Sequence, residues 1–240
     1  MKNYFYSILL AALTVCCYTT TNAQQPFQVG FEVTPHLSWL YNEDDVKNNN
    51  FSYYITPGSS IGLSTAYSFN RHLGVAIHAL YSRQGQWYKT NDVGRCRELE
   101  YYKMPIMFTL RFPISQDIHF VSKAGPQFGV LRKASLVDRS GTVLDFNHQK
   151  GYNSLDIAAA TYLGIQVFAG NIVIDLAVRA DASLSGIENT NYKKDINEPW
   201  LRSARITEER KPTHNITLGT TLGIGYVFFH KAMDSKPHLD

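Results

Sequence analysis

Cysteine is scarce in this sequence: the chain of 240 residues has three, Cys16, Cys17 and Cys96. The first two lie in an N-terminal stretch that we expect to be removed, which leaves Cys96 as the only thiol of the mature chain. A single thiol excludes an intramolecular disulfide. The mature protein must therefore be stabilised in another way, and closure of a β-sheet on itself is one such way.

Long apolar runs are also missing. After the N-terminus, no stretch reaches the roughly 18 apolar residues that a membrane-spanning helix needs. The N-terminal apolar stretch from Ile8 to Cys17 follows Lys2 and precedes polar residues and the small Ala23. Because this is the arrangement of a secretory signal peptide, we predict one over residues 1–23.

A lipoprotein signal is the alternative interpretation of the same segment. Leu13-Thr14-Val15-Cys16 is similar to a lipobox, which would place a lipid on Cys16. The bulky Val15 stands where such signals carry a small residue, so we favour the ordinary signal peptide.

An excess of one charge is absent as well. The formal net charge is +3, and lysine, arginine, aspartate and glutamate are mixed along the chain. Since there is no basic stripe, we expect no nucleic-acid partner. The sequence also contains no pattern that calls for a cofactor.

What the sequence does contain is alternation. From Asn171 to Ile187 every second residue is apolar, and the residues between them are mostly small, charged or hydroxyl-bearing. This is a β-strand with one apolar and one polar face. The pattern recurs in eight runs, which begin near residues 27, 61, 73, 102, 118, 155, 172 and 216. An even number of strands is typical of bacterial outer-membrane barrels.

Alternation is also a property of soluble barrels, so other features must identify the face that meets solvent. The polar face is rich in glycine, alanine and serine, which suits a narrow interior better than a hydrated exterior. Connections alternate in length: residues 70–71, 113–117 and 169–171 are short, whereas residues near 41–57, 89–98, 132–153 and 188–215 form long polar loops. Short turns at one end and long loops at the other are the outer-membrane arrangement.

We therefore predict an all-β fold, an eight-stranded antiparallel up-and-down transmembrane β-barrel with a polar packed interior. The barrel domain is expected over residues 24–230 and a periplasmic tail over residues 231–240. An even number of strands puts both ends of the chain in the periplasm and the long loops outside the cell. Arg83 and Glu100 fall on the apolar face, but at the long-loop end, where a lipid-facing charge costs only about 0–1 kcal/mol.

Charged residues on the polar face balance in sign. A charge buried alone is costly, so we expect these side chains to pair across the lumen and to plug it. A diffusion pore is then disfavoured. The residues are Glu32, Lys103, Arg111, Lys123, Asp156, Asp175, Arg179 and Asp181.

Two features predict local irregularity. Pro35, Pro105 and Pro126 lie inside predicted strands, where each removes a hydrogen-bond donor, so we expect bulges or irregular pairing there. Within the third long loop, Ala134 to Phe146 has β-prone residues on both sides of Asp138-Arg139-Ser140-Gly141. This segment is predicted to form a hairpin that extends the barrel.

A family resemblance follows from several short motifs in order. Tyr101-Tyr102-Lys103-Met104-Pro105-Ile106 resembles the aromatic, apolar, proline, apolar strand of the PorT-like outer-membrane β-barrel family. Similar matches are His78 to Gly85 with the third strand, Ala124-Gly125-Pro126 with a Gly-Pro segment, and Leu184 to Ile187 with the end of the penultimate strand. The resemblance implies an outer-membrane barrel, and the secretion or gliding role of the family's namesake does not transfer automatically.

The last predicted strand carries a second resemblance. Thr221, Gly223, Tyr226 and Phe228 are similar to the polar, glycine, aromatic, aromatic pattern that the barrel-assembly machinery recognises. The usual pattern closes at the C-terminal residue, whereas this chain continues to Asp240. The resemblance implies that this machinery is a partner during biogenesis.

Chemical motifs give no catalytic or metal site. Gly58 to Gly62 matches the G-x-S-x-G elbow around Ser60, but an alternating strand follows where the elbow needs a helix. His36, His78 and His119 lie on the polar face without the close spacing of metal ligands, so we expect hydrogen-bonded interior histidines.

The fourth long loop is the candidate binding segment. It contains aromatic and basic residues that could contact a surface ligand or lipid head groups, set against the simpler interpretation of a solvated loop. The residues are Tyr192, Trp200, Arg202 and Arg205.

We expect an outer-membrane protein with a structural, assembly or surface-binding role through its long loops, and no enzymatic activity. Expected partners are outer-membrane lipids and an unidentified surface ligand or secretion-system component. Two alternatives stay open: an outer-membrane lipid-modifying hydrolase, and a soluble periplasmic ligand-binding barrel.

Overall fold

The computed structural model describes residues 27–47, 52–90, 93–138, 142–145, 148–189 and 211–228. The predicted signal peptide, the C-terminal tail and the candidate binding residues Tyr192, Trp200, Arg202 and Arg205 lie outside the described residues.

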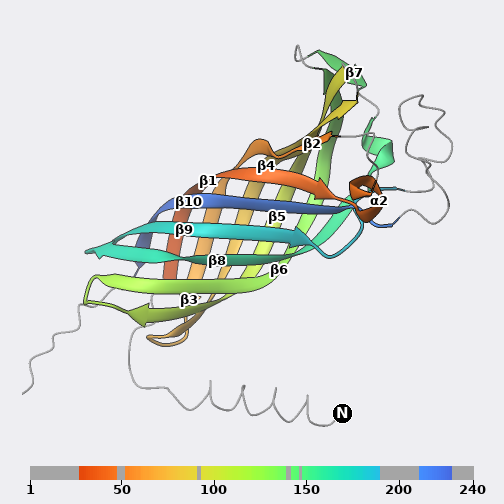
Figure 1. Cartoon of the computed structure of the whole chain (residues 1–240). Helices are drawn as coiled ribbons and strands as arrows, with labels where there is room; N and C mark the ends of the chain where they lie inside the picture. Colours follow the sequence, from red (N-terminus) through yellow and green to blue (C-terminus); the bar gives the residue numbers. More distant parts are fainter. Residues whose placement is uncertain are drawn as a thin grey trace, which may run out of the picture.

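Eight long strands close into one barrel (Figure 1). They are β1 (Phe27–Tyr41), β3 (Thr56–Ser68), β4 (Leu73–Thr90), β5 (Val93–Pro113), β6 (Ile118–Asp138), β8 (Leu155–Ala169), β9 (Ile172–Ser183) and β10 (His214–Phe228). Each strand pairs antiparallel with its neighbours along the chain, and β1 pairs with β10 from Phe27 opposite Phe228 onward. The predicted eight-stranded antiparallel barrel is confirmed.

Shorter elements lie at the long-loop end. β2 (Ser52–Tyr54) pairs with β4, and β7 (Val143–Asp145) pairs with β6. The helix α2 (Glu43–Val46) and the 3₁₀ helix η1 (His148–Gly151) complete this end. The pairing of β6 with β7 confirms the predicted hairpin, and Figure 1 shows β7 beyond the body of the barrel.

Short turns join the strands at the opposite end. Asn70 Oδ1 accepts hydrogen bonds from the backbone N–H groups of His72 and Leu73, which closes the turn between β3 and β4. Gly170 has a φ of 61° between β8 and β9, a conformation that glycine adopts without steric cost. Because β1 begins and β10 ends here, the described barrel starts and finishes at the short-turn end.

The outer face of the barrel is an apolar belt. Exposed side chains alternate with buried ones along β1, β8, β9 and β10. Phe108 is 71% exposed, and most other outward residues of the strands are large and apolar. A continuous apolar surface of this kind is costly in water and matches the lipid-facing band of a membrane barrel. In the described residues no helix is long and apolar enough to cross a membrane.

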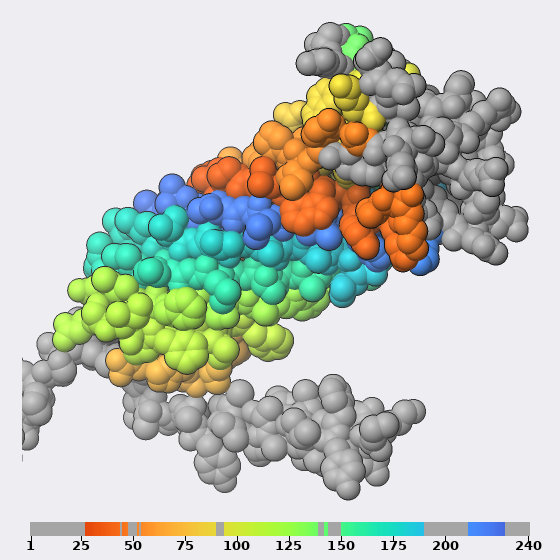
Figure 2. Space-filling model, in the orientation of Figure 1, coloured from red at the N-terminus to blue at the C-terminus, as the bar shows by residue number. Residues whose placement is uncertain are grey.

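The inner face is polar and filled. Most of the buried polar and charged side chains alternate with the outward residues and so lie inside the barrel. On the face that Figure 2 shows, side chains close the wall between the strands. The lumen is therefore packed with polar side chains.

One predicted loop is wrong. Residues 89–98 were expected to form a long polar loop, but β4 continues to Thr90 and β5 begins at Val93, with these two residues paired. Polarity misleads here because a strand that rises above the apolar belt can carry polar residues on both faces. The extended ends of β4, β5 and β6, with β2 and β7, form a sheet beyond the barrel (Figure 1).

The irregular pairing expected at the prolines is confirmed, but the bulges are not. Pairing between β1 and β10 stops at Val33 and resumes at His36 in the same register, so Pro35 interrupts the ladder without shifting it. Near Pro105 and Pro126 the ladder between β5 and β6 skips residues in the same way. The register shift in this ladder lies at Glu100/Tyr101 instead.

Candidate functional site

The alternation of side chains along each strand places the predicted interior charges in the lumen. All eight have buried side chains on the inner face: Glu32, Lys103, Arg111, Lys123, Asp156, Asp175, Arg179 and Asp181. Four of them meet in one cluster: Glu32, Lys103, Arg179 and Asp181. The other four lie outside this cluster, and among the described residues Asp175 Oδ1 has no hydrogen-bond partner.

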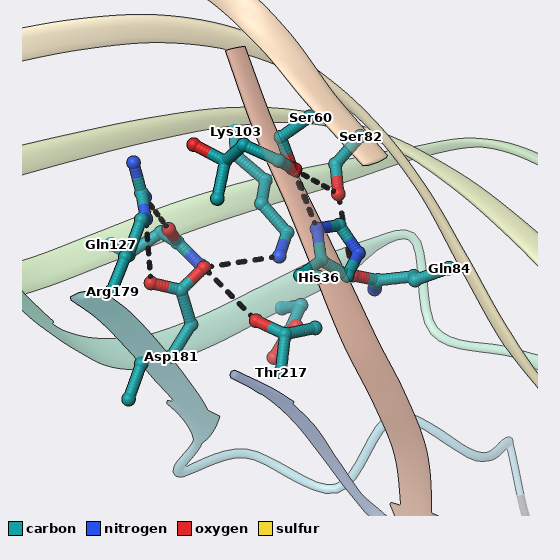
Figure 3. A network of polar contacts seen from close by, with 12 residues as sticks. His36, Ser60, Ser82, Gln84, Lys103, Gln127, Arg179, Asp181 and Thr217 are labelled. Carbon is teal, nitrogen blue, oxygen red and sulfur yellow. Dashed lines mark hydrogen bonds and ion pairs between the residues drawn. The ribbon is translucent and has the colours of Figure 1, made fainter. Parts of the chain in front are cut away.

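Arg179 is the centre of the cluster. Its Nε donates to Asp181 Oδ1 at 3.0 Å, its Nη1 donates to Glu32 Oε1 at 3.3 Å, and its Nη2 donates to Gln127 Oε1 at 2.8 Å. These partners come from β9, β1 and β6, so one guanidinium connects three strands of the barrel. Figure 3 shows Arg179 with Gln127 and Asp181. A planar group with five donors suits this role better than an ammonium.

Each carboxylate of the cluster has a further partner. Asp181 Oδ2 accepts from Lys103 Nζ at 3.4 Å and from Thr217 Oγ1 at 3.3 Å. Glu32 Oε1 lies 3.0 Å from His78 Nδ1. Buried ion pairs are better tolerated when the carboxylates have additional hydrogen bonds, and Asp181 and Glu32 each have at least one beyond Arg179. The cluster and its hydrogen-bond partners thus connect six strands across the lumen: β1, β4, β5, β6, β9 and β10.

The remaining four charges form no ion pair within 4.0 Å among the described residues. Arg111 donates to Gln166 Oε1 at 3.2 Å and to Ser68 Oγ at 2.5 Å, and Asp156 accepts from Ser183 Oγ at 2.7 Å. Lys123 Nζ lies 4.2 Å from the centre of the Tyr162 ring, a cation–π contact. Direct pairing across the lumen therefore does not extend to these residues or to Asp175.

Ser60 does not form a nucleophile elbow. It lies within β3, and its hydroxyl donates to Ser82 Oγ at 2.9 Å (Figure 3). His36 Nδ1 is 3.5 Å from Ser60 Oγ but 3.2 Å from the carbonyl oxygen of Thr34. A carbonyl only accepts, so that contact requires Nδ1 to carry the proton, and Nδ1 is then no base for the serine.

The three interior histidines make separate contacts. His36 lies beside Thr34 and Ser60, and His78 lies against Glu32. The ring of His119 packs 4.9 Å from the ring of Phe168. In the part of the chain that the structure describes, no three histidine, cysteine, aspartate or glutamate side chains are grouped as a metal site would require.

An apolar cluster lies at the long-loop end of the barrel, and we call it the mouth cluster. It consists of Leu40, Leu99, Tyr101, Leu131, Ala134, Tyr152 and Ile187. Beside it, Arg97 Nη1 donates to Glu188 Oε1 at 3.1 Å, and Tyr152 and Glu188 form an isolated β-bridge. The mouth cluster joins residues of β1, β5 and β6 to two long connections, the one between β6 and β8 and the one between β9 and β10.

Sequence reasoning missed the Arg97 and Glu188 pair. Both residues lie in segments that were interpreted as polar loops, so neither entered the set of interior charges. The missed signal was alternation: Arg97, Leu99 and Tyr101 continue the inward face of β5 beyond the apolar belt.

The helix α2 is fastened to the start of β10. Glu43 accepts hydrogen bonds from Lys211 and from Lys47, the latter at 2.6 Å. These two bonds lower the pKa of Glu43 to about 2. Asn42 Nδ2 donates to the Lys211 carbonyl at 2.7 Å and to Thr213 Oγ1 at 2.9 Å.

A recess of about 170 Å³ opens beside α2, lined mostly by apolar residues that include Trp39, Tyr41, Val46 and Ile55. It lies beyond the point where the pairing of β1 with β3 ends, at Ser38 opposite Thr56. Gln86, which lines the recess, accepts a hydrogen bond from the Leu40 N–H at 2.5 Å. Pockets for small-molecule ligands usually measure about 300–1,000 Å³, so this recess is below that range.

The residues of the predicted assembly signal all lie on β10. Thr221 points inward and is 2.8 Å from Thr34 Oγ1, and Gly223 pairs with Glu32 and Asp175. Tyr226 and Phe228 point outward with ring centres 4.9 Å apart, at the edge of the apolar belt. β10 ends at Phe228.

Comparison with known proteins agrees with this architecture. The family described as "Outer membrane protein beta-barrel domain" matches residues 22–189, which is more than half of the chain. No curated protein matches the sequence significantly.

Several solved structures are similar. Neisserial surface protein A (NspA) is 14% identical over 84% of this chain and 97% of its own, with a TM-score of 0.49. OprG from Pseudomonas aeruginosa is 11% identical over 87% and 97%, with a TM-score of 0.45. Ail, the attachment invasion locus protein of Yersinia pestis, is 16% identical over 84% and 98%, with a TM-score of 0.43.

The matching family is described as a β-barrel domain of outer-membrane proteins, which agrees with the closed barrel of this chain. The chain belongs to the outer membrane protein β-barrel domain family, and it is an outer-membrane β-barrel protein.

Proposed function

We propose that this protein is a surface protein of the PorT-like type. The barrel serves as a membrane anchor, and the sheet and loops at the long-loop end carry a structural, assembly or surface-binding role outside the cell. The observation that carries the proposal is the contrast between a filled lumen and an extended sheet above the belt. We propose further that the protein is neither a diffusion pore nor an enzyme.

The filled lumen supports the exclusion of a pore. The Arg179 cluster crosses the barrel at the level of the apolar belt, and the mouth cluster lies above it. An eight-stranded barrel has an interior just wide enough for side chains, so these groups leave no continuous aqueous channel.

The lengths of the connections support the proposed orientation. Short turns and both ends of the described barrel lie together, while β2, β7 and α2 lie at the opposite end. Outer-membrane barrels have short periplasmic turns and longer extracellular loops. The extended sheet of β4, β5 and β6 is then exposed outside the cell, where it can meet a partner.

Cysteine labelling of intact cells tests this orientation. In a Cys96→Ser background, Lys89→Cys or Lys133→Cys places a thiol at the long-loop end, and Arg71→Cys places one in the turn between β3 and β4. A membrane-impermeant maleimide is expected to label the first two in intact cells, and the third only after the outer membrane is opened. Labelling of Arg71→Cys alone in intact cells overturns the proposal.

A further inference from the structure

Charged side chains gather on the outer faces of β4, β5 and β6, directly above the apolar belt. We call this group the rim cluster; it consists of Arg83, Glu98, Glu100, Arg132 and Lys133. The belt below it ends in an aromatic pair, Tyr81 and Tyr102, whose ring centres are 5.9 Å apart. Aromatic girdles mark the membrane interface in barrels of this kind, so the rim cluster lies at the level of the lipid head groups.

Strand register sets the arrangement of the cluster. Glu100 is opposite Arg83 on β4 and opposite Lys133 on β6. The register shift at Glu100/Tyr101 adds one residue to β6, and that residue is Arg132. The irregularity therefore brings a third cation beside the same carboxylate.

Contacts hold Arg132 in this position. Its Nη1 donates to Glu100 Oε2 at 2.7 Å, and its guanidinium lies 5.7 Å from the centre of the Tyr81 ring. An arginine that is held by a carboxylate and an aromatic face keeps other N–H groups for a further acceptor. Arg83 is held only loosely, at 3.9 Å from Glu98.

Exposure makes the outer chemistry of the cluster cationic. The side chains of Arg83 and Arg132 are 58% and 50% exposed, whereas that of Glu100 is 14% exposed. Lys133 is exposed as well. The side chain of Glu98 is 42% exposed, so a group approaching from the membrane meets three cations and one exposed carboxylate, and the accessible part of the cluster carries a net positive charge.

We propose that the rim cluster binds the phosphate groups of lipids in the surrounding outer leaflet. Phosphate oxygens accept charge-assisted hydrogen bonds from arginine and lysine, and basic residues at a membrane surface commonly recognise anionic head groups. The apolar belt directly below accommodates the acyl chains of the same lipid. The assignment of the lipid to the outer leaflet depends on the proposed orientation of the barrel. The recognition of a lipid phosphate does not depend on it.

The test measures lipid retained by the folded, full barrel in zwitterionic detergent, by native mass spectrometry. The probes are diphosphoryl lipid A and the same glycolipid with its phosphates removed. The variant Arg83→Gln/Arg132→Gln/Lys133→Gln is expected to retain the phosphorylated lipid at least about tenfold less than the wild type, because three charge-assisted contacts are lost.

The control removes the same number of cations elsewhere. Lys47→Gln/Lys211→Gln/Arg71→Gln changes two residues beside α2 and one in a short turn, and it is expected to retain lipid like the wild type. Glu100→Gln removes the central carboxylate and is expected to increase retention. A mobility shift on an unheated gel checks that each variant is folded, and Lys133→Gln alone replaces the triple variant if that variant does not fold.

Equal retention of phosphorylated and dephosphorylated lipid would overturn the proposal, as would equal losses in the rim and control variants. Because both ends of the barrel are accessible in detergent, the result does not depend on orientation. Failure of lipid binding is thereby separate from failure of the proposed surface role, which the cysteine labelling tests.

Discussion

Arg97 and Glu188, 91 residues apart in the sequence, form an ion pair of 3.1 Å beside the mouth cluster, with both side chains almost fully buried. The guanidinium of Arg97 also lies 4.6 Å from the centre of the Tyr88 ring. This pair joins the beginning of β5 to the segment that follows β9. It lies above the apolar belt, so it stabilises the part of the molecule to which we assign the function.

Removal of Arg97 tests the contribution of this pair. Arg97→Met leaves the Glu188 carboxylate buried without its partner, which typically costs about 3–5 kcal/mol. The expected result is a lower urea concentration at the midpoint of unfolding, followed by the loss of the folded band on an unheated gel.

Arg83→Met is the matched control, because it removes an exposed arginine from the neighbouring strand and should cost about 0–1 kcal/mol. Arg97→Met/Glu188→Met should recover much of the lost stability. If Arg97→Met and Arg83→Met unfold at the same urea concentration, the ion pair does not stabilise the mouth.

Charge reversal at Arg179 tests the packed lumen. Arg179→Glu places a carboxylate against Glu32 and Asp181, where wild-type Arg179 makes contacts of 3.3 and 3.0 Å. Repulsion between buried carboxylates should strongly reduce the yield of folded barrel in detergent. Arg71→Glu, in an exposed turn, should fold like the wild type; equal yields for the two variants would contradict the charge-paired interior.

Gly125 tests how closely the strands approach beside the prolines. A Cβ atom at this position would lie 2.0 Å from the carbonyl oxygen of Ile106 on β5. Gly125→Ala should therefore destabilise the barrel by about 1–3 kcal/mol, measured as the urea midpoint. Gly94→Ala, where the nearest atom to a Cβ would be 3.8 Å away, is the control and should leave the midpoint unchanged.

Cys96 is expected to be unreactive in the folded protein. Burial, reinforced by the negative charge of Glu98, raises the pKa of its thiol to about 12. At pH 8 the thiolate fraction is then very small, so alkylation by iodoacetamide should be at least about 100-fold slower than in urea. Measured in a chain that begins at Gln24, similar rates in both states would show that this part of β5 is not packed as described.

Much of the fold could be predicted because the side-chain period of a strand is two. Asp175, Arg179 and Asp181 follow one another on alternate positions, and parity alone places them inside the barrel. Alternation gives only the face on which a side chain lies. It does not give the level along the barrel axis, or the position around the barrel, at which two interior residues meet. The contact of Arg179 on β9 with Glu32 on β1 depends on how each of these strands is aligned with β10 between them. The sequence does not give that alignment, so it could not reveal the contact.

The same limit explains the charges that do not pair. Lys123 was expected to meet an acidic partner, but it lies over the Tyr162 ring, and parity gave no reason to select that contact. Above the belt the apolar signal itself disappears, which is why Arg97 and Glu188 were interpreted as loop residues. Both the contact of Lys123 with Tyr162 and the pair of Arg97 with Glu188 depend on the alignment of strands in the folded barrel.

Ion conduction tests the central claim most directly. The refolded protein is inserted into a planar lipid bilayer in 1 M KCl, and current is recorded at low voltage, with insertion verified by the mobility shift of the reconstituted protein. A lumen filled by the Arg179 cluster and covered by the mouth cluster predicts no stable conductance steps. Reproducible steps whose size rises with salt concentration would show an open aqueous channel and would contradict the account.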